Sequence, residues 1–146
     1  MAIETAFETL IELALQDTNE AAKRLGHAVR ASAQAQEKLN LLISYQHDYI
    51  GQLAQRLSSG VSGQQHRNFQ EFIAGLERAI LQQSEVCKSC QQVAGHELDL
   101  WRDSERKRLS YETLAQRQTL AAQRRERQRD QKQTDEHAAR SRRTLN

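Results

Sequence analysis

No proline interrupts the 146 residues, and this absence limits the possible folds more than any other feature of the sequence. Proline in a helix interior costs ~3 kcal/mol, so a chain without it can continue one helix for many turns. The chain is also rich in Ala, Leu, Gln, Glu, Arg and Lys, which are strong helix formers. Apolar residues make up only 38%, which suits a narrow seam between helices better than a thick core. The sequence therefore predicts an all-α protein.

The clearest break in the helical pattern is the Ser- and Gly-rich segment 58–63. Gly60 suits the left-handed residue that follows a helix, and Ser62 with Gln65 forms a capping-box pattern for the next one. We expect one helix over about 3–58, a turn over 59–63 and a second helix over about 64–140. Together they form a single coiled-coil domain spanning 1–146.

Apolar and small residues follow a 4,3 spacing on both sides of this turn, which is the heptad period of a left-handed coiled coil. The predicted seam positions are Ile11, Leu15, Thr18, Ala22, Leu25, Val29, Ser32, Gln36, Leu39, Ile43, Gln46, Ile50, Leu53 and Leu57, then Phe69, Ile73, Leu76, Ile80, Gln83, Cys87, Cys90, Ala94, Glu97 and Trp101. A short turn makes the helices antiparallel, with facing residue numbers that add to roughly 123. Ile80 is then expected to face Ile43, and Trp101 to face Ala22.

In this register the first helix is too short to cover residues 121–146, so the second helix should extend without an intrachain partner. This overhang is basic, with Arg124, Arg125, Arg127, Arg129, Lys132, Arg140, Arg142 and Arg143. A basic helix can bind nucleic acid, an anionic membrane or an acidic protein surface. Four interspersed acids and the lack of aromatic residues favour a protein partner over nucleic acid; plain solvation is the alternative. A lone helix is marginal in water, so we expect it to fray until it is bound.

The residues for catalysis or metal binding are missing from this pattern. Cys87 and Cys90 resemble half of a zinc site, but no second Cys or His pair has suitable spacing. Their three-residue spacing places them on the seam instead, as small buried side chains. The five histidines are scattered, and no phosphate-binding loop or nucleophile motif is present. We therefore expect a protein that is not an enzyme and that binds no metal or other cofactor.

A second apolar stripe is predicted beside the seam. It consists of Leu42, Tyr45 and Tyr49 on the first helix and Phe72, Leu76 and Ala79 on the second, Leu76 itself being a seam residue. Clustered exposed aromatic side chains are typical of docking surfaces. The alternative is that these residues only widen the seam. We expect substitution of the aromatics by alanine to preserve helicity and abolish one interaction.

No stretch of the chain approaches the ~20 apolar residues of a membrane span. Residues 1–12 carry three acidic side chains and no basic one, which is unlike a signal peptide. The sequence therefore predicts a cytoplasmic location.

Local segments along nearly the whole chain resemble the flagellar export protein FliJ family. They are Glu8-Thr9-Leu10, Leu42-Ile43-Ser44-Tyr45-Gln46 with Tyr49, Asn68-Phe69-Gln70-Glu71-Phe72-Ile73, Leu76-Glu77-Arg78-Ala79-Ile80, Trp101-Arg102, Arg117-Gln118-Thr119, and Asp130-Gln131-Lys132 with Asp135-Glu136. The resemblance implies an antiparallel two-helix coiled coil, similar to the central shaft of rotary ATP synthases. It also implies a stalk that enters the hexameric flagellar export ATPase ring, promotes ring assembly and hydrolysis, binds the cytoplasmic domain of the export gate, and escorts substrate-specific export chaperones. Any association with the inner membrane would be peripheral, through these partners.

The resemblance also assigns residues to these roles. The gate-binding face falls on Lys38, Leu42, Tyr45, Tyr49, Phe72, Leu76, Ala79 and Gln83, of which the six apolar or aromatic residues are predicted to bind. The ring-binding end falls regionally on Ile3, Phe7 and Leu10 with Arg124, Arg125, Arg127, Arg129 and Lys132. Two other functions stay open: the equivalent stalk of a virulence-type secretion system, and a nucleic-acid-binding helical arm.

Overall fold

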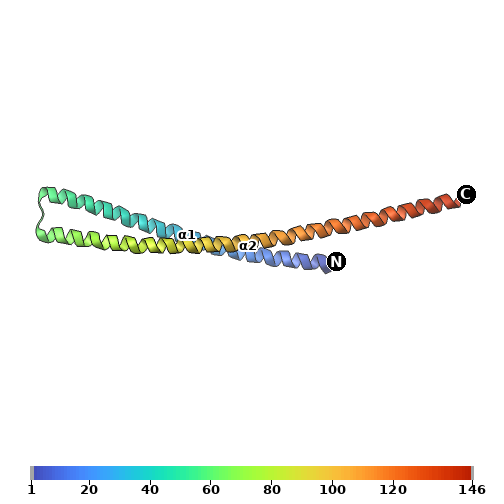
Figure 1. Cartoon of the computed structure of the whole chain (residues 1–146), viewed down its shortest axis with the longest axis horizontal. Coiled ribbons are helices and arrows are strands. Elements are labelled where there is room, and N and C mark those ends of the chain that lie inside the picture. The colour runs from blue at the N-terminus through green and yellow to red at the C-terminus, as the bar shows by residue number, and fades with distance from the viewer. Residues whose placement is uncertain (1, 146) are drawn as a thin grey trace. The chain divides into compact units, whose positions relative to one another are not determined.

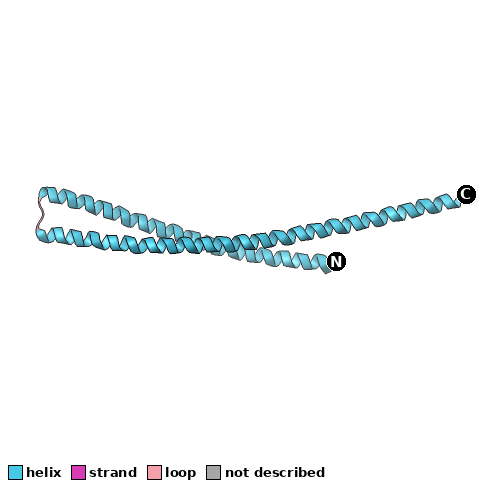
Figure 2. Cartoon of the chain, viewed as in Figure 1, coloured by secondary structure: helices cyan, strands magenta, loops and turns pink. Residues whose placement is uncertain are grey.

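A computed structural model describes residues 2–145 as two long helices, α1 (Ala2–Ser59) and α2 (Gly63–Thr144), joined by a three-residue link. Figures 1 and 2 show these helices and no strand among the described residues. The predicted all-α helical hairpin is confirmed. The predicted end of the second helix near 140 is wrong, because α2 continues to Thr144. Its last turns contain Ala, Arg and Ser and no Gly or Pro, so nothing in them stops the helix earlier.

The turn has the predicted local chemistry. Gly60 has a positive φ of 89°, the left-handed conformation that lets the chain leave α1 without a Cβ clash. Ser62 caps α2, since its Oγ accepts a hydrogen bond from the backbone N–H of Gln65 at 3.2 Å. The carbonyl oxygen of Ser62 accepts the N–H of His66 at 3.0 Å and begins the helical ladder.

The internal packing divides into two units, each with a segment of both helices. The turn unit is Asn19–Arg102, and the terminal unit is Met1–Thr18 with Asp103–Asn146. Whether the chain folds as one domain stays a prediction.

The seam of α1 differs from the predicted one at every second position. The observed seam positions, all buried or half-buried, are Phe7, Ile11, Ala14, Thr18, Ala21, Leu25, Ala28, Ser32, Ala35, Leu39, Leu42, Gln46, Tyr49 and Leu53. Ala21 is 0% exposed, whereas Ile43, which was expected to face Ile80, is 46% exposed. The prediction is therefore wrong at six positions, where the residue before the predicted one lies in the seam: Leu15, Ala22, Val29, Gln36, Ile43 and Ile50. Leu57, which was also predicted in the seam, is exposed.

The reason is an alanine at every seventh residue. Ala14, Ala21, Ala28 and Ala35 are all buried, and small side chains let two helices approach closely. Each large residue in the neighbouring stripe lies one position further round the helix, so a heptad period alone cannot separate the two stripes. On α2 the predicted seam positions are all buried or half-buried, and half-burial continues at Ser104, Arg108, Tyr111, Ala115 and Gln118.

Three contacts align the helices of the turn unit as an antiparallel pair. Gln83 is only 7% exposed and its Nε2 donates a hydrogen bond to the carbonyl oxygen of Ala35 at 3.0 Å. The rings of Tyr49 and Phe72 are in contact, and Arg24 forms an ion pair with Glu97 at 3.4 Å. The resulting register is close to the predicted one. Cys87 is buried in this seam, as predicted, and Cys90 is partly exposed; both are free thiols.

Candidate interaction surfaces

The predicted aromatic patch near the turn is partly seam and partly surface. Tyr49 and Phe72 stack with ring centroids 4.5 Å apart and planes tilted by 54°. Tyr49 lies on the seam, whereas Phe72 and Tyr45 are 49% and 47% exposed. A small groove of about 190 Å³ opens between Tyr49, Asn68, Phe69 and Phe72. The patch is therefore an open flank of the coiled coil, since its inner residues pack and its outer rings remain accessible.

The other patch residues follow the same division. Leu42 and Leu76 occupy seam positions, so the expectation that Leu42 lies beside the seam is wrong. Ala79 is half-buried next to the seam. Gln83 cannot present its side chain while that side chain is bonded to Ala35 inside the seam. The interpretation that these residues widen the seam holds for Leu42 and Tyr49. Tyr45 and Phe72 are exposed, and their role as a docking surface stays a prediction.

The terminal unit exposes apolar side chains on several sides of α1. Ile3, Leu10, Leu13 and Leu15 are all exposed, whereas Phe7 is half-buried. A groove of about 310 Å³ lies between the helices, lined by Glu4, Phe7, Glu8, Ile11, Ala115, Gln118 and Thr119. The seam is thus incompletely filled here. Of the predicted ring-binding residues on α1, Ile3 and Leu10 are accessible and Phe7 lines the groove.

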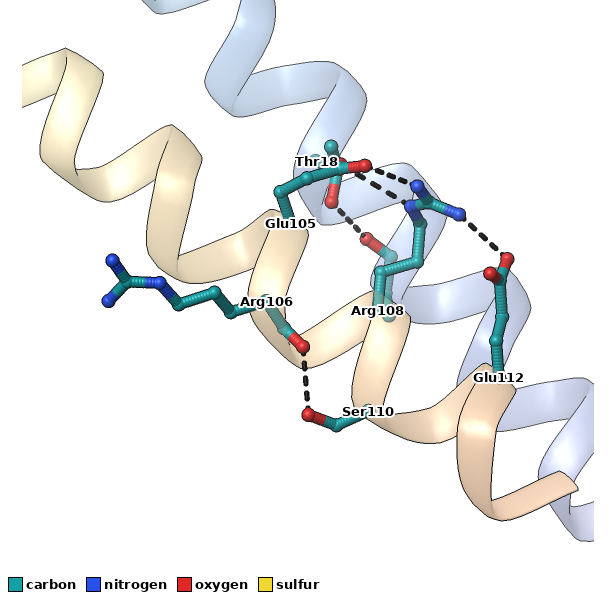
Figure 3. Close-up of polar contacts among 7 residues, drawn as sticks. Thr18, Glu105, Arg106, Arg108, Ser110 and Glu112 are labelled. Carbon is teal, nitrogen blue, oxygen red and sulfur yellow. Dashed lines mark hydrogen bonds and ion pairs between the residues drawn. The ribbon is translucent and has the colours of Figure 1, made fainter. Parts of the chain in front are cut away.

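A charged cluster occupies the seam of the same unit. Arg108 lies between Glu105 and Glu112 and pairs with both, and its Nη1 is 2.7 Å from the Glu112 carboxylate (Figure 3). The hydrogen bond from Arg108 lowers the pKa of Glu105, and the same bond raises the pKa of Arg108. On α1, Thr18 is buried and its hydroxyl donates to the carbonyl oxygen of Ala14 at 2.9 Å (Figure 3).

Sequence reasoning missed this cluster because the predicted seam ended at Trp101. The spacing of Glu105, Arg108 and Glu112 was the available signal, since residues three and four apart share a helix face. Extending the heptad count by one more heptad, from Trp101 to Arg108, places Arg108 on the seam.

The basic overhang is exposed from residue 122 to residue 145. Every residue from 122 to 145 is accessible, including Arg124, Arg125, Arg127, Arg129 and Lys132. Within residues 2–145 none of the overhang's basic side chains forms an ion pair. Side-chain hydrogen bonds in this part of α2 join Gln131 to Asp135 and link Thr134, Ser141 and Thr144 to backbone carbonyls. The charges of the overhang are therefore available to a partner.

Comparison with known proteins identifies the family. The flagellar FliJ protein family matches residues 3–144. The flagellar FliJ protein of Escherichia coli K12 is 36% identical over 141 residues, which cover 97% of this chain and 96% of the relative. The flagellar FliJ protein of Salmonella typhi is 37% identical over the same shares of both chains. The chain belongs to the flagellar FliJ family.

Membership in the FliJ family confirms the resemblance drawn from local motifs, and it covers both helices rather than one short segment. The relatives are named as flagellar proteins and not as enzymes. Over residues 2–145, neither helix has a stretch apolar enough to cross a membrane, and no three His, Cys, Asp or Glu side chains converge in a group that could hold a metal. The assignments of Tyr45 and its neighbours to a gate, and of the terminal unit to an ATPase ring, stay predictions.

Proposed function

We propose that this FliJ family member is a non-enzymatic component of the flagellar export apparatus. It acts as a stalk that binds the export ATPase ring through the terminal unit, promotes ring assembly and hydrolysis, and contacts the cytoplasmic domain of the export gate through the patch around Tyr45 and Phe72. It also escorts substrate-specific export chaperones. Its location is cytoplasmic, with peripheral association at the inner membrane through these partners.

The observation that carries this proposal is the pairing of exposed apolar and unpaired basic residues in one unit. Ile3, Leu10 and Leu13 on α1, and Leu109, Leu114 and Leu120 on α2, are exposed in the terminal unit, which also carries the basic overhang. A helix pair that is apolar on several sides is suited to insertion into a surrounding partner, because contact on one side would leave most of that surface in water. The basic side chains supply attraction at the rim of such a site.

The second surface supports a link to a different partner. Tyr45 and Phe72 belong to the turn unit, so they can bind a gate domain without using any residue of the overhang. Aromatic residues that are half-exposed and held by a packed neighbour, as Phe72 is by Tyr49, lose little conformational freedom on binding.

The direct test is to mix the purified chain with the export ATPase of the same organism. We expect co-elution and a several-fold rise in ATP hydrolysis at saturating chain, with no hydrolysis by the chain alone. The triple variant Ile3→Ser, Leu10→Ser, Leu13→Ser tests the apolar contact, because it removes exposed apolar side chains of α1. It should lose most of the stimulation of ATP hydrolysis while remaining helical by circular dichroism. Unchanged hydrolysis with the wild-type chain, together with no co-elution, would contradict the proposal.

A further inference from the structure

The eight basic residues of the overhang are not spread evenly around α2. Arg125, Arg129, Lys132, Arg140 and Arg143 are separated by 4, 3, 8 and 3 residues, which places them on one face of an α-helix. Glu136 lies on this face as well, so its formal charge is +4. We refer to these five residues as the basic face.

The rest of the overhang surface is electrically neutral. It holds the basic residues Arg124, Arg127 and Arg142, and three acidic residues, Glu126, Asp130 and Asp135. The whole positive excess of the overhang therefore belongs to the basic face. A distribution of this kind is not needed for solubility alone, since mixed charges on all sides would keep the helix soluble.

The basic face continues the seam. Tyr111, Ala115 and Gln118 are half-buried on the α2 side of the terminal unit, and the heptad positions that follow them are Ala122, Arg125, Arg129 and Lys132. Beyond the last half-buried residue, Ala121, the side of α2 that packs on α1 thus becomes predominantly basic. From Arg125 to Arg143 the face is about 27 Å long at a rise of 1.5 Å per residue.

We propose that the basic face binds an elongated acidic surface on a protein partner, lying along α2 where α1 no longer covers it. This inference rests on the proposed function, in which the partner is the export ATPase, and adds which side of the overhang makes the contact. Charge complementarity identifies the partner's chemistry, because the basic side chains have no ion-pair partner within residues 2–145 and the opposite side offers no net charge. A protein is favoured over nucleic acid because residues 122–145 include no Phe, Tyr or Trp for base stacking.

The test compares two triple variants that remove equal charge. Arg125→Ala, Arg129→Ala, Lys132→Ala deletes three basic residues from the basic face, and Arg124→Ala, Arg127→Ala, Arg142→Ala deletes three from the neutral side. Alanine is a strong helix former, so both variants should remain helical, which circular dichroism checks. Binding of the full-length chains to the export ATPase is measured at several salt concentrations, with a single-stranded 20-nucleotide RNA and a DNA of the same length as further probes.

We expect the basic-face variant to bind the ATPase at least about tenfold more weakly than wild type, with a shallower salt dependence, and the neutral-side variant to stay within about threefold. Equal losses in both variants would overturn the assignment of the face while leaving the proposed function intact. Tight nucleic-acid binding that only the basic-face variant loses would overturn the choice of a protein partner. No ATPase binding by the wild-type chain would overturn the proposed function and this inference together.

Discussion

The seams of the two units are built from different side chains. In the turn unit the middle of the seam is closed, with Ala21, Ala28 and Ala35 buried on α1 and Gln83 and Cys87 buried on α2. In the terminal unit the seam holds a charged cluster around Arg108 and an open groove of about 310 Å³. The middle of the turn unit's seam is thus filled by small and buried side chains, whereas the seam of the terminal unit stays partly open.

The largest expected effect comes from enlarging the alanine seam. Ala21→Leu places three extra carbon atoms at a fully buried position, so we expect the free energy of unfolding to fall by about 1–3 kcal/mol. Ala22→Leu is the matched control, because Ala22 is exposed and should change stability by less than about 0.5 kcal/mol. Urea denaturation followed by circular dichroism measures both. A larger loss for Ala22→Leu would mean that the helices pack along the other stripe.

A smaller loss of stability is expected nearer the turn, where substitutions of Leu42 and Ile43 should differ in their cost. Leu42 occupies the seam but is only half-buried, so Leu42→Ala should cost about 1–2 kcal/mol, less than a fully buried leucine. Ile43→Ala should cost less than about 0.5 kcal/mol, because Ile43 is exposed. Equal costs in the same urea experiment would show that the two stripes share the interface.

The buried glutamine tests how the closed seam tolerates a polar group. Gln83→Ala removes the hydrogen bond to the Ala35 carbonyl, and we expect a loss of about 1 kcal/mol. The carbonyl of Ala35 lies inside α1, where it can keep its helical partner, so no strong further penalty is expected. No loss on thermal denaturation would mean that this bond does not help to hold the register.

The smallest expected effect is a pH dependence confined to the terminal unit. The pKa of Glu105 is lowered in the folded chain, so its contribution to stability is full above the ordinary value of about 4.5 and is lost as the pH falls through the lowered pKa. Glu105→Gln should therefore flatten the stability profile below about pH 5, while Glu85→Gln, at an exposed site that pairs only with Lys88 on the same helix, leaves it unchanged. Identical profiles for wild type and Glu105→Gln would show that the cluster is not formed in solution.

Hydrogen exchange compares the units without mutation. We expect amides of the turn-unit seam to exchange slowest, and those of residues 122–145 to exchange fastest, because no tertiary packing protects that part of α2. Binding of the ATPase should then slow exchange in the overhang. Equal protection along all of α2 in the free chain would contradict the predicted fraying.

Much of the fold could be predicted from the sequence because its signals are local. The absence of proline, the left-handed Gly60 and the Ser62 cap defined two helices and their turn, and the heptads of α2 located its seam. The seam of α1 was misplaced because Leu15 and Val29 are bulkier than the neighbouring Ala14 and Ala28, and because Ile43 and Ile50 are as plausible at a seam as the neighbouring Leu42 and Tyr49. Choosing between the two stripes depends on how closely the helices approach, which is a tertiary property.

The candidate surfaces were harder to predict for the same reason. Tyr45 and Phe72 were correctly placed on an accessible flank, but Leu42 and Tyr49 pack inside once the seam shifts by one residue. The sequence gives the count of basic residues in the overhang, whereas their separation into a basic face and a neutral side becomes meaningful only when α2 is helical to Thr144.

The central claim is that separate surfaces of the two units bind separate partners. The most direct test measures binding of two variants, Arg125→Ala, Arg129→Ala, Lys132→Ala and Tyr45→Ala, Phe72→Ala, to the export ATPase and to the cytoplasmic domain of the export gate. We predict reciprocal results: the first variant loses ATPase binding and keeps gate binding, and the second does the opposite. Loss of both partners in either variant while its helicity is intact, or loss of neither in both, would contradict the account.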